Sequence, residues 1–174
     1  MISRKLQMGL RRNRGKQLLP KFLEEIARVL NKPKGSIQLL DLDKTDELWE
    51  AYINRRQSRI NDTAVTFRRT WVANDIEEVR RLINKLRDGV VDRPIFLFRA
   101  LSEYCGAIET TSKEIFEHAF QLISLDQEDL IAVNNDMSLG VLFSYSTDWL
   151  EKSSVEVYEL FVWGDEWLAV LINE

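Results

Sequence analysis

The chain has 174 residues, of which 45% are hydrophobic and 30% are charged. These fractions are typical of globular proteins and exclude the low hydrophobicity and high charge of disordered chains. The longest uncharged stretches are only as long as a strand, so we expect no membrane-spanning segment and a cytoplasmic location. A single cysteine and a single histidine exclude an internal disulfide and a Cys/His zinc cluster, and we expect no cofactor.

The two halves of the chain carry opposite charge. Residues 1–87 contain 20 basic and 11 acidic side chains, whereas residues 88–174 contain 4 and 17. One interpretation is a surface that attracts a charged partner, and the other is that the halves pack together and partly neutralise each other. The sequence leaves both open.

Basic residues dominate the N-terminus, where the first 21 residues include seven Lys or Arg and no acid. We predict a mobile or surface-laid basic arm over residues 1–15, followed by a single domain over residues 16–174. Clustered guanidinium groups bind nucleic-acid phosphates without sequence preference. The candidate nucleic-acid contacts are therefore Arg11, Arg12, Arg14 and Lys16, and the alternative is a solvated tail.

Apolar residues at helical spacing predict four helices in the first three quarters of the chain. Their apolar faces lie within residues 18–30, 48–53, 76–86 and 115–123. Short apolar or alternating runs predict strands at residues 37–40, 65–71 and 94–98.

After residue 129 the pattern becomes that of strands, at residues 130–133, 139–146, 155–162 and 167–172. Gly164 and Asp165 stand between the last two runs as in a two-residue hairpin. We therefore predict an α+β fold in which N-terminal helices pack on a mainly antiparallel sheet with a C-terminal four-strand meander.

One short string resembles a catalytic motif. Asp41-Leu42-Asp43-Lys44-Thr45 is similar to the first motif of haloacid-dehalogenase-type phosphatases. The resemblance implies Asp41 as nucleophile and Asp43 as general acid beside magnesium. Lys44 departs from the family's usual glycine, and no later catalytic set is recognisable. The alternative, which we favour, is that Asp43 caps a helix.

Carboxylates and aromatic side chains alternate through the C-terminal half. Such a surface would steer a basic protein partner with its acids and anchor it with its rings. The alternative is that the rings are core residues and the acids only solubilise. The predicted partner-binding residues are Asp129, Asp136, Tyr145, Asp148, Trp149, Glu156, Tyr158, Glu159, Asp165 and Glu166.

The segment from Glu156 to Trp167, in an acidic mixed-fold chain of this size, resembles bacterial toxin-immunity proteins of the contact-dependent growth-inhibition type. The resemblance implies a cytoplasmic, non-enzymatic protein that binds one cognate toxin, often a basic nuclease, and occludes its active site. The predicted function is therefore binding of a basic toxin domain. The alternatives are a nucleic-acid-associated regulator that uses the basic arm, and a magnesium-dependent phosphatase that uses Asp41 and Asp43.

Overall fold

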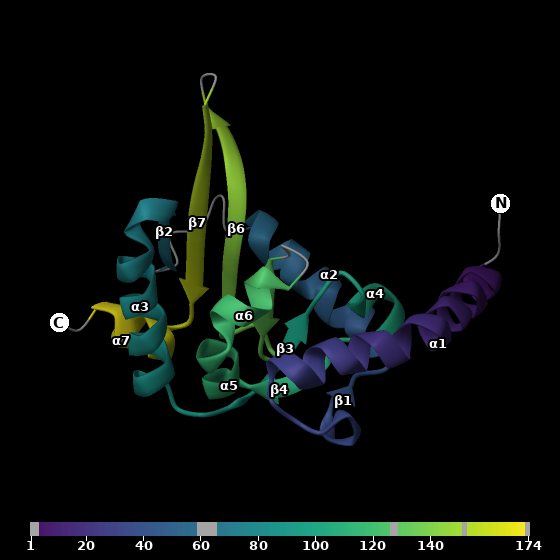
Figure 1. Cartoon of the computed structure of the whole chain (residues 1–174). Helices are drawn as coiled ribbons and strands as arrows, with labels where there is room; N and C mark the ends of the chain where they lie inside the picture. Colours follow the sequence, from purple (N-terminus) through teal and green to yellow (C-terminus); the bar gives the residue numbers. More distant parts are fainter. Residues whose placement is uncertain (1–3, 59–65, 126–128, 151–152, 173–174) are drawn as a thin grey trace.

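The computed structural model describes residues 4–58, 66–125, 129–150 and 153–172 (Figure 1). Helices and strands alternate irregularly along the chain. Their order is α1 (Arg4–Val29), η1 (Lys34–Ser36), β1 (Gln38–Leu39), α2 (Leu42–Ser58), β2 (Thr66–Val72), η2 (Ala73–Asp75), α3 (Ile76–Gly89), β3 (Pro94–Phe98), α4 (Ser102–Cys105), β4 (Ile108–Thr111), α5 (Ser112–Glu117), α6 (Ala119–Ser124), β5 (Leu130–Val133), β6 (Gly140–Leu150), β7 (Ser153–Trp163) and α7 (Asp165–Ile172).

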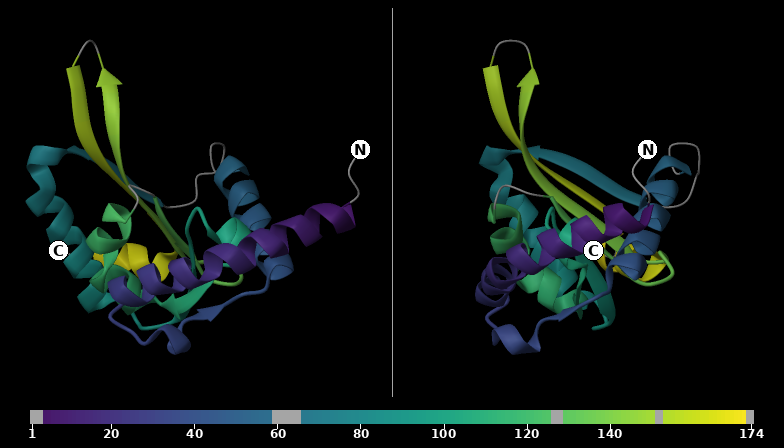
Figure 2. Two further views of the ribbon diagram at one scale, coloured as in Figure 1. Left: turned by 45° about the vertical axis from the view of Figure 1, so that its right-hand side comes forward. Right: turned by 90° about the vertical axis from the view of Figure 1, so that its right-hand side faces the viewer.

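The seven strands of the described residues form one sheet in the order β1-β4-β3-β5-β6-β7-β2, and all neighbouring strands pair antiparallel. The predicted α+β class with N-terminal helices is confirmed. β5, β6 and β7 follow one another in sequence and in space as a meander. The long β6–β7 hairpin projects beyond the rest of the sheet in every view (Figures 1 and 2).

The predicted fourth strand of the meander and its hairpin are wrong, because the segment after β7 is the helix α7. Gly164 turns the chain with a φ of 102°, and α7 begins at the next residue. Trp167 is fully buried with its ring edge-to-face on Phe116, and Val170 lies against Gly89 at the end of α3. A short, wholly apolar run does not distinguish a buried helix from a buried strand by its period.

Residues 4–15, which belong to the predicted mobile or surface-laid arm, form the N-terminal half of α1, and this helix begins at Arg4 and continues without a break to Val29. Gly15 lies in the middle of this helix, against the backbone carbonyl of Tyr104 in α4. Its missing side chain lets the two helices approach closely. The N-terminal half of α1 extends outward past α4 and α2 (Figure 1).

Three smaller features were not predicted. The fourth predicted helix is divided at His118 into α5 and α6. Strand β4 lies between β1 and β3, and the short helix α4 precedes it. The β4 segment contains one apolar residue, Ile108, and therefore shows no apolar run.

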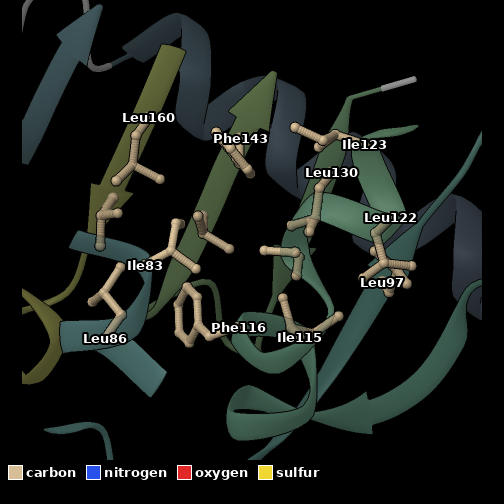
Figure 3. Close-up of a cluster of buried hydrophobic side chains, with 14 of the residues drawn as sticks. Ile83, Leu86, Leu97, Ile115, Phe116, Leu122, Ile123, Leu130, Phe143 and Leu160 are labelled. Carbon is tan, nitrogen blue, oxygen red and sulfur yellow. The ribbon is translucent and has the colours of Figure 1, made fainter. Parts of the chain in front are cut away.

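Helices cover both faces of the sheet. α3, α5, α6, α7 and the second half of α1 pack on one face around a large apolar cluster that includes Leu86, Ile115 and Leu160 (Figure 3). α2 packs on the other face, where Leu48 and Tyr52 meet a smaller cluster. Within the described part of the chain, no helix combines the length and hydropathy needed to cross a lipid bilayer.

Candidate binding cleft

A cleft of about 580 Å³ opens on the α2 side of the sheet. It lies between the N-terminal half of α1, the first turns of α2, the β3–α4 turn and the start of β5. Its lining combines aromatic, cationic and anionic side chains, namely Arg11, Thr45, Asp46, Trp49, Phe98, Arg99, Ala100, Ser102, Glu103, Asp129 and Ile131.

Aromatic rings form the apolar part of the cleft. Trp49 in α2 has 39% of its surface exposed, although its ring centroid lies 5.3 Å from that of Phe98 and 5.3 Å from that of Tyr52. Phe98 and Tyr52 are buried in the smaller core cluster. The indole is therefore supported from beneath and presents a rigid apolar surface to the solvent.

An arginine from α1 joins three walls of the cleft. The Nη1 and Nη2 groups of Arg11 donate to the two carboxylate oxygens of Asp46 at 2.6 and 2.7 Å. Its Nε–H donates to the backbone carbonyl of Glu103. The hydrogen bonds with Asp46 raise the pKa of Arg11. A bidentate pair of this kind is directional as well as strong, so it fixes α1 against α2 and α4.

Two further side chains hold the walls from behind. The Thr45 hydroxyl accepts the backbone N–H of Ala107 at 3.0 Å and donates to the Asp41 carbonyl at 2.8 Å. Arg99 is only 7% exposed, and its guanidinium donates to the carbonyl of Leu125. The cleft is thus built before any ligand arrives.

Asp129 brings a perturbed carboxylate to the cleft at the start of β5. Its pKa is raised, chiefly because desolvation disfavours the charged form and also because of Glu159. Arg56 and Arg99 act in the opposite direction and do not overcome the desolvation. Perturbed carboxylates gather at binding and catalytic sites more often than elsewhere.

The structure separates the predicted partner-binding residues. Of those whose side chains are described, Asp129 alone lines the cleft. Tyr145 and Tyr158 pack with the large cluster on the opposite face of the sheet, where Glu156 hydrogen-bonds Tyr145. Glu159 points to the α2 face and pairs with Arg68 at 2.6 Å.

The remaining members of that set lie at the far end of the sheet or outside the description. Asp136 accepts the backbone N–H of Ser138 in the β5–β6 turn. Asp165 and Glu166 begin α7, and Glu166 pairs with Arg93 at 2.8 Å. The side chains of Asp148 and Trp149 lie outside the described residues. The predicted set therefore does not form one surface.

The candidate nucleic-acid contacts are divided in the same way. Arg11 is held by Asp46, and Arg12 lies 3.6 Å from Asp43. Arg14 and Lys16 are exposed on α1. Within the described residues, Arg14 and Lys16 are therefore the members of the predicted basic group that face the solvent without an ion pair.

The candidate phosphatase residues have structural partners. α2 begins at Leu42, and Asp41 accepts the backbone N–H of Lys44 at 2.8 Å, so the cap is Asp41 and the prediction of Asp43 as the cap is wrong. Neither aspartate lines the cleft. Among the residues that the structure describes, no group of three or more His, Cys, Asp or Glu is placed to hold a metal ion.

Most of the cleft was missed by sequence reasoning. Trp49 and Phe98 were interpreted only as parts of a helix face and a strand, and Arg99 and Glu103 carried no motif. No local pattern connects Arg11 to Asp46, because 35 residues separate them. The one usable signal was the charge of Asp129 beside an apolar strand.

No protein-family model, curated protein or solved structure matches this chain. The resemblance to toxin-immunity proteins stays a prediction.

Proposed function

We propose that this protein is a non-enzymatic binding protein that holds a protein partner at the cleft between α1, α2 and α4. The observation that carries the proposal is Trp49, an indole 39% exposed on a rigid aromatic base inside a cleft of about 580 Å³. Binding hot spots are enriched in tryptophan and arginine at the centre of well-packed pockets. Trp49 is therefore the anchor of the proposed interface.

The chemistry around Trp49 favours binding over turnover. The chain's single histidine, His118, lies at the α5–α6 junction and does not line the cleft. Asp129 can act as an acid or base, but among the described lining residues the hydroxyls of Thr45 and Ser102 bond to backbone groups and no histidine stands beside them as an activating base. Arg11 and Asp46 bond to each other through both nitrogens and both oxygens, whereas in a catalytic site such groups would contact the substrate.

We infer further that the partner is a basic toxin domain, as the resemblance of the segment from Glu156 to Trp167 to toxin-immunity proteins implies. Rigid walls support this role, because inhibitors that occlude an active site bind through preformed surfaces. Occlusion needs no reaction, and it leaves the ion pair between Arg11 and Asp46 intact.

The test is capture of a partner from the native host with the whole chain as bait, followed by affinity measurement with the purified partner. Trp49→Ala is expected to weaken binding by about 2 kcal/mol or more, as for a central hot spot. Val91→Ala, which truncates an exposed apolar side chain outside the cleft, is the control and is expected to bind as the natural protein does. Equal binding of both variants would place the interface elsewhere. If the partner is a toxin, co-expression of the natural chain should relieve growth inhibition and co-expression of Trp49→Ala should not.

A further inference from the structure

The charged side chains that line the cleft differ in how many hydrogen bonds and ion pairs they already form within the protein. Arg11 donates from Nη1 and Nη2 to the Asp46 carboxylate and from Nε to the Glu103 carbonyl. Arg99 is buried, with its guanidinium turned to the Leu125 carbonyl. Both cations therefore face the protein rather than an incoming ligand.

The carboxylates are more available. Glu103 and Asp129 are both exposed, and neither forms an ion pair within the described part of the chain. The cleft is lined by two cations, Arg11 and Arg99, and by three carboxylates, Asp46, Glu103 and Asp129, so the formal charge of its lining is −1.

Trp49 adds a second, independent feature that selects the same kind of ligand. The face of an indole attracts cations through its quadrupole, more strongly than the rings of Tyr or Phe do. Trp49 packs on Phe98 and lines the same cleft as Glu103 and Asp129. A ring with carboxylates nearby is the arrangement by which proteins hold ammonium and guanidinium groups.

We propose that the cleft receives a cationic side chain, lysine or arginine, of the protein partner, with Trp49 contacting the cation and with Glu103 and Asp129 pairing with it. The inference rests on the proposed function for the source of the side chain, but its chemistry can be tested without the partner. An anionic group would be repelled by Glu103 and Asp129, and the guanidinium of Arg11 is already bonded to Asp46. Desolvation raises the pKa of Asp129 although Arg56 and Arg99 lower it, so these two cations only partly compensate this carboxylate.

The experiment is an NMR titration of the full chain at low salt with small probes of known charge. The probes are the N-acetyl amides of arginine and lysine, with those of Nε-acetyl-lysine and glutamate as charge-removed and charge-reversed controls. The cationic probes are expected to shift the Trp49 indole N–H and the Asp129 amide in a saturable way. The controls are expected to leave both unchanged.

Variants separate the ring from the carboxylate. Trp49→Leu and Asp129→Asn are each expected to weaken the cationic probe about 3- to 30-fold, the range of a cation–π contact or a partly desolvated charge pair. Trp49→Phe retains an aromatic face and is expected to recover part of the affinity. Glu117→Gln removes one exposed carboxylate from α5, which lies on the other face of the sheet, and is expected to have no effect. Amide-peak dispersion checks the fold of each variant.

Preference for the glutamate probe, equal response to all four probes, or no saturable shift with either cation would overturn the inference. Failure of the inference and failure of the proposed function remain distinguishable. If Trp49→Ala loses the partner but the cationic probes do not bind, the proposed function is supported and the proposed binding of a cationic side chain is contradicted. If the cationic probes bind the cleft but Trp49→Ala binds the captured partner normally, the cationic site is supported and the proposed protein interface at the cleft is contradicted.

Discussion

Asp129 has a raised pKa because desolvation outweighs the attraction of Arg56 and Arg99. The folded state then holds the proton more tightly than the unfolded state, so stability falls as the pH rises from the unfolded pKa, near 3.8, through the folded one. Asp129→Asn removes this penalty. We expect the variant to have a higher free energy of unfolding at neutral pH, measured by chemical denaturation, and little difference in acid.

The control for Asp129 is Asp136, whose pKa is lowered by hydrogen bonds from Ser138. That carboxylate contributes stability above its unfolded pKa and loses it as the pH falls through the folded pKa. Asp136→Asn is therefore expected to lower the free energy of unfolding at neutral pH, opposite in sign to Asp129→Asn. The same sign for both variants would show that the environment of Asp129 is not the one described.

Tyr145 offers a second titration on the opposite face of the sheet. Its hydrogen bond to Glu156 raises its pKa to about 12, from an ordinary value of 10.0. Between these values the folded state keeps a proton that the unfolded state loses, so stability falls with rising pH across that window. Glu156→Gln is expected to bring the late phenolate transition, followed by ultraviolet absorbance, back toward 10.0.

Two further variants test whether the late phenolate transition belongs to Tyr145. Tyr145→Phe should remove the same late step, and Glu159→Gln should leave it in place because Glu159 points to the other face and pairs with Arg68. An alkaline profile that Glu156→Gln does not change would contradict the hydrogen bond.

At the scale of elements, α1 is joined to α4 through a position that admits no side chain. A Cβ on Gly15 would lie 2.2 Å from the Tyr104 carbonyl oxygen, a backbone atom that cannot rotate away. Gly15→Ala is expected to lower the free energy of unfolding by about 1–3 kcal/mol through overpacking. It should also separate Arg11 from Asp46, seen as faster hydrogen exchange in the N-terminal half of α1.

Gly9 is the matched control in the same helix, because a Cβ there meets nothing within 4 Å. Gly9→Ala is expected to raise the free energy of unfolding by roughly 0.5–1 kcal/mol, as alanine replaces glycine inside a helix. If Gly15→Ala also stabilised the protein, the close contact between α1 and α4 would not exist.

The elements that the sequence predicted correctly are those with a clear period. The faces around Leu48 and Leu86 have helical spacing, and both lie in helices with those side chains buried. The errors have tertiary causes. Residues 4–15 lack an apolar face, and their helix is held by Arg11 and by Gly15. The apolar run of α7 fits a strand equally well, because nothing local shows that Trp167 packs on Phe116.

The candidate site could not be assembled from the sequence for a reason that belongs to the whole sheet. Successive residues of a strand point to opposite faces, so Glu156 and Glu159 are close in sequence but separated by the sheet. The cleft instead gathers side chains from α1, α2, β3, α4 and β5. The opposite charges of the two halves are also partly joined, because β2 pairs with β7 and Lys32 lies 2.6 Å from Glu114.

The shared sheet predicts how the whole molecule unfolds. β7 contributes Leu160 to the cluster on one face and Trp163 to the cluster on the other, so loss of either helical layer removes support from the same strand. Leu48→Ala on the buried face of α2 is expected to lower the free energy of unfolding by about 2–5 kcal/mol. Ile83→Val on the buried face of α3 is expected to lower it by about 0.5–1.5 kcal/mol. The two costs should add within about 0.5 kcal/mol, since Leu48 and Ile83 belong to separate clusters on opposite faces of the sheet. Far-ultraviolet circular dichroism and tryptophan fluorescence should report one coincident transition for every variant. A separate early transition in Leu48→Ala would mean that the α2 layer unfolds alone, and the residues from α1 to α7 would then not form one cooperative domain.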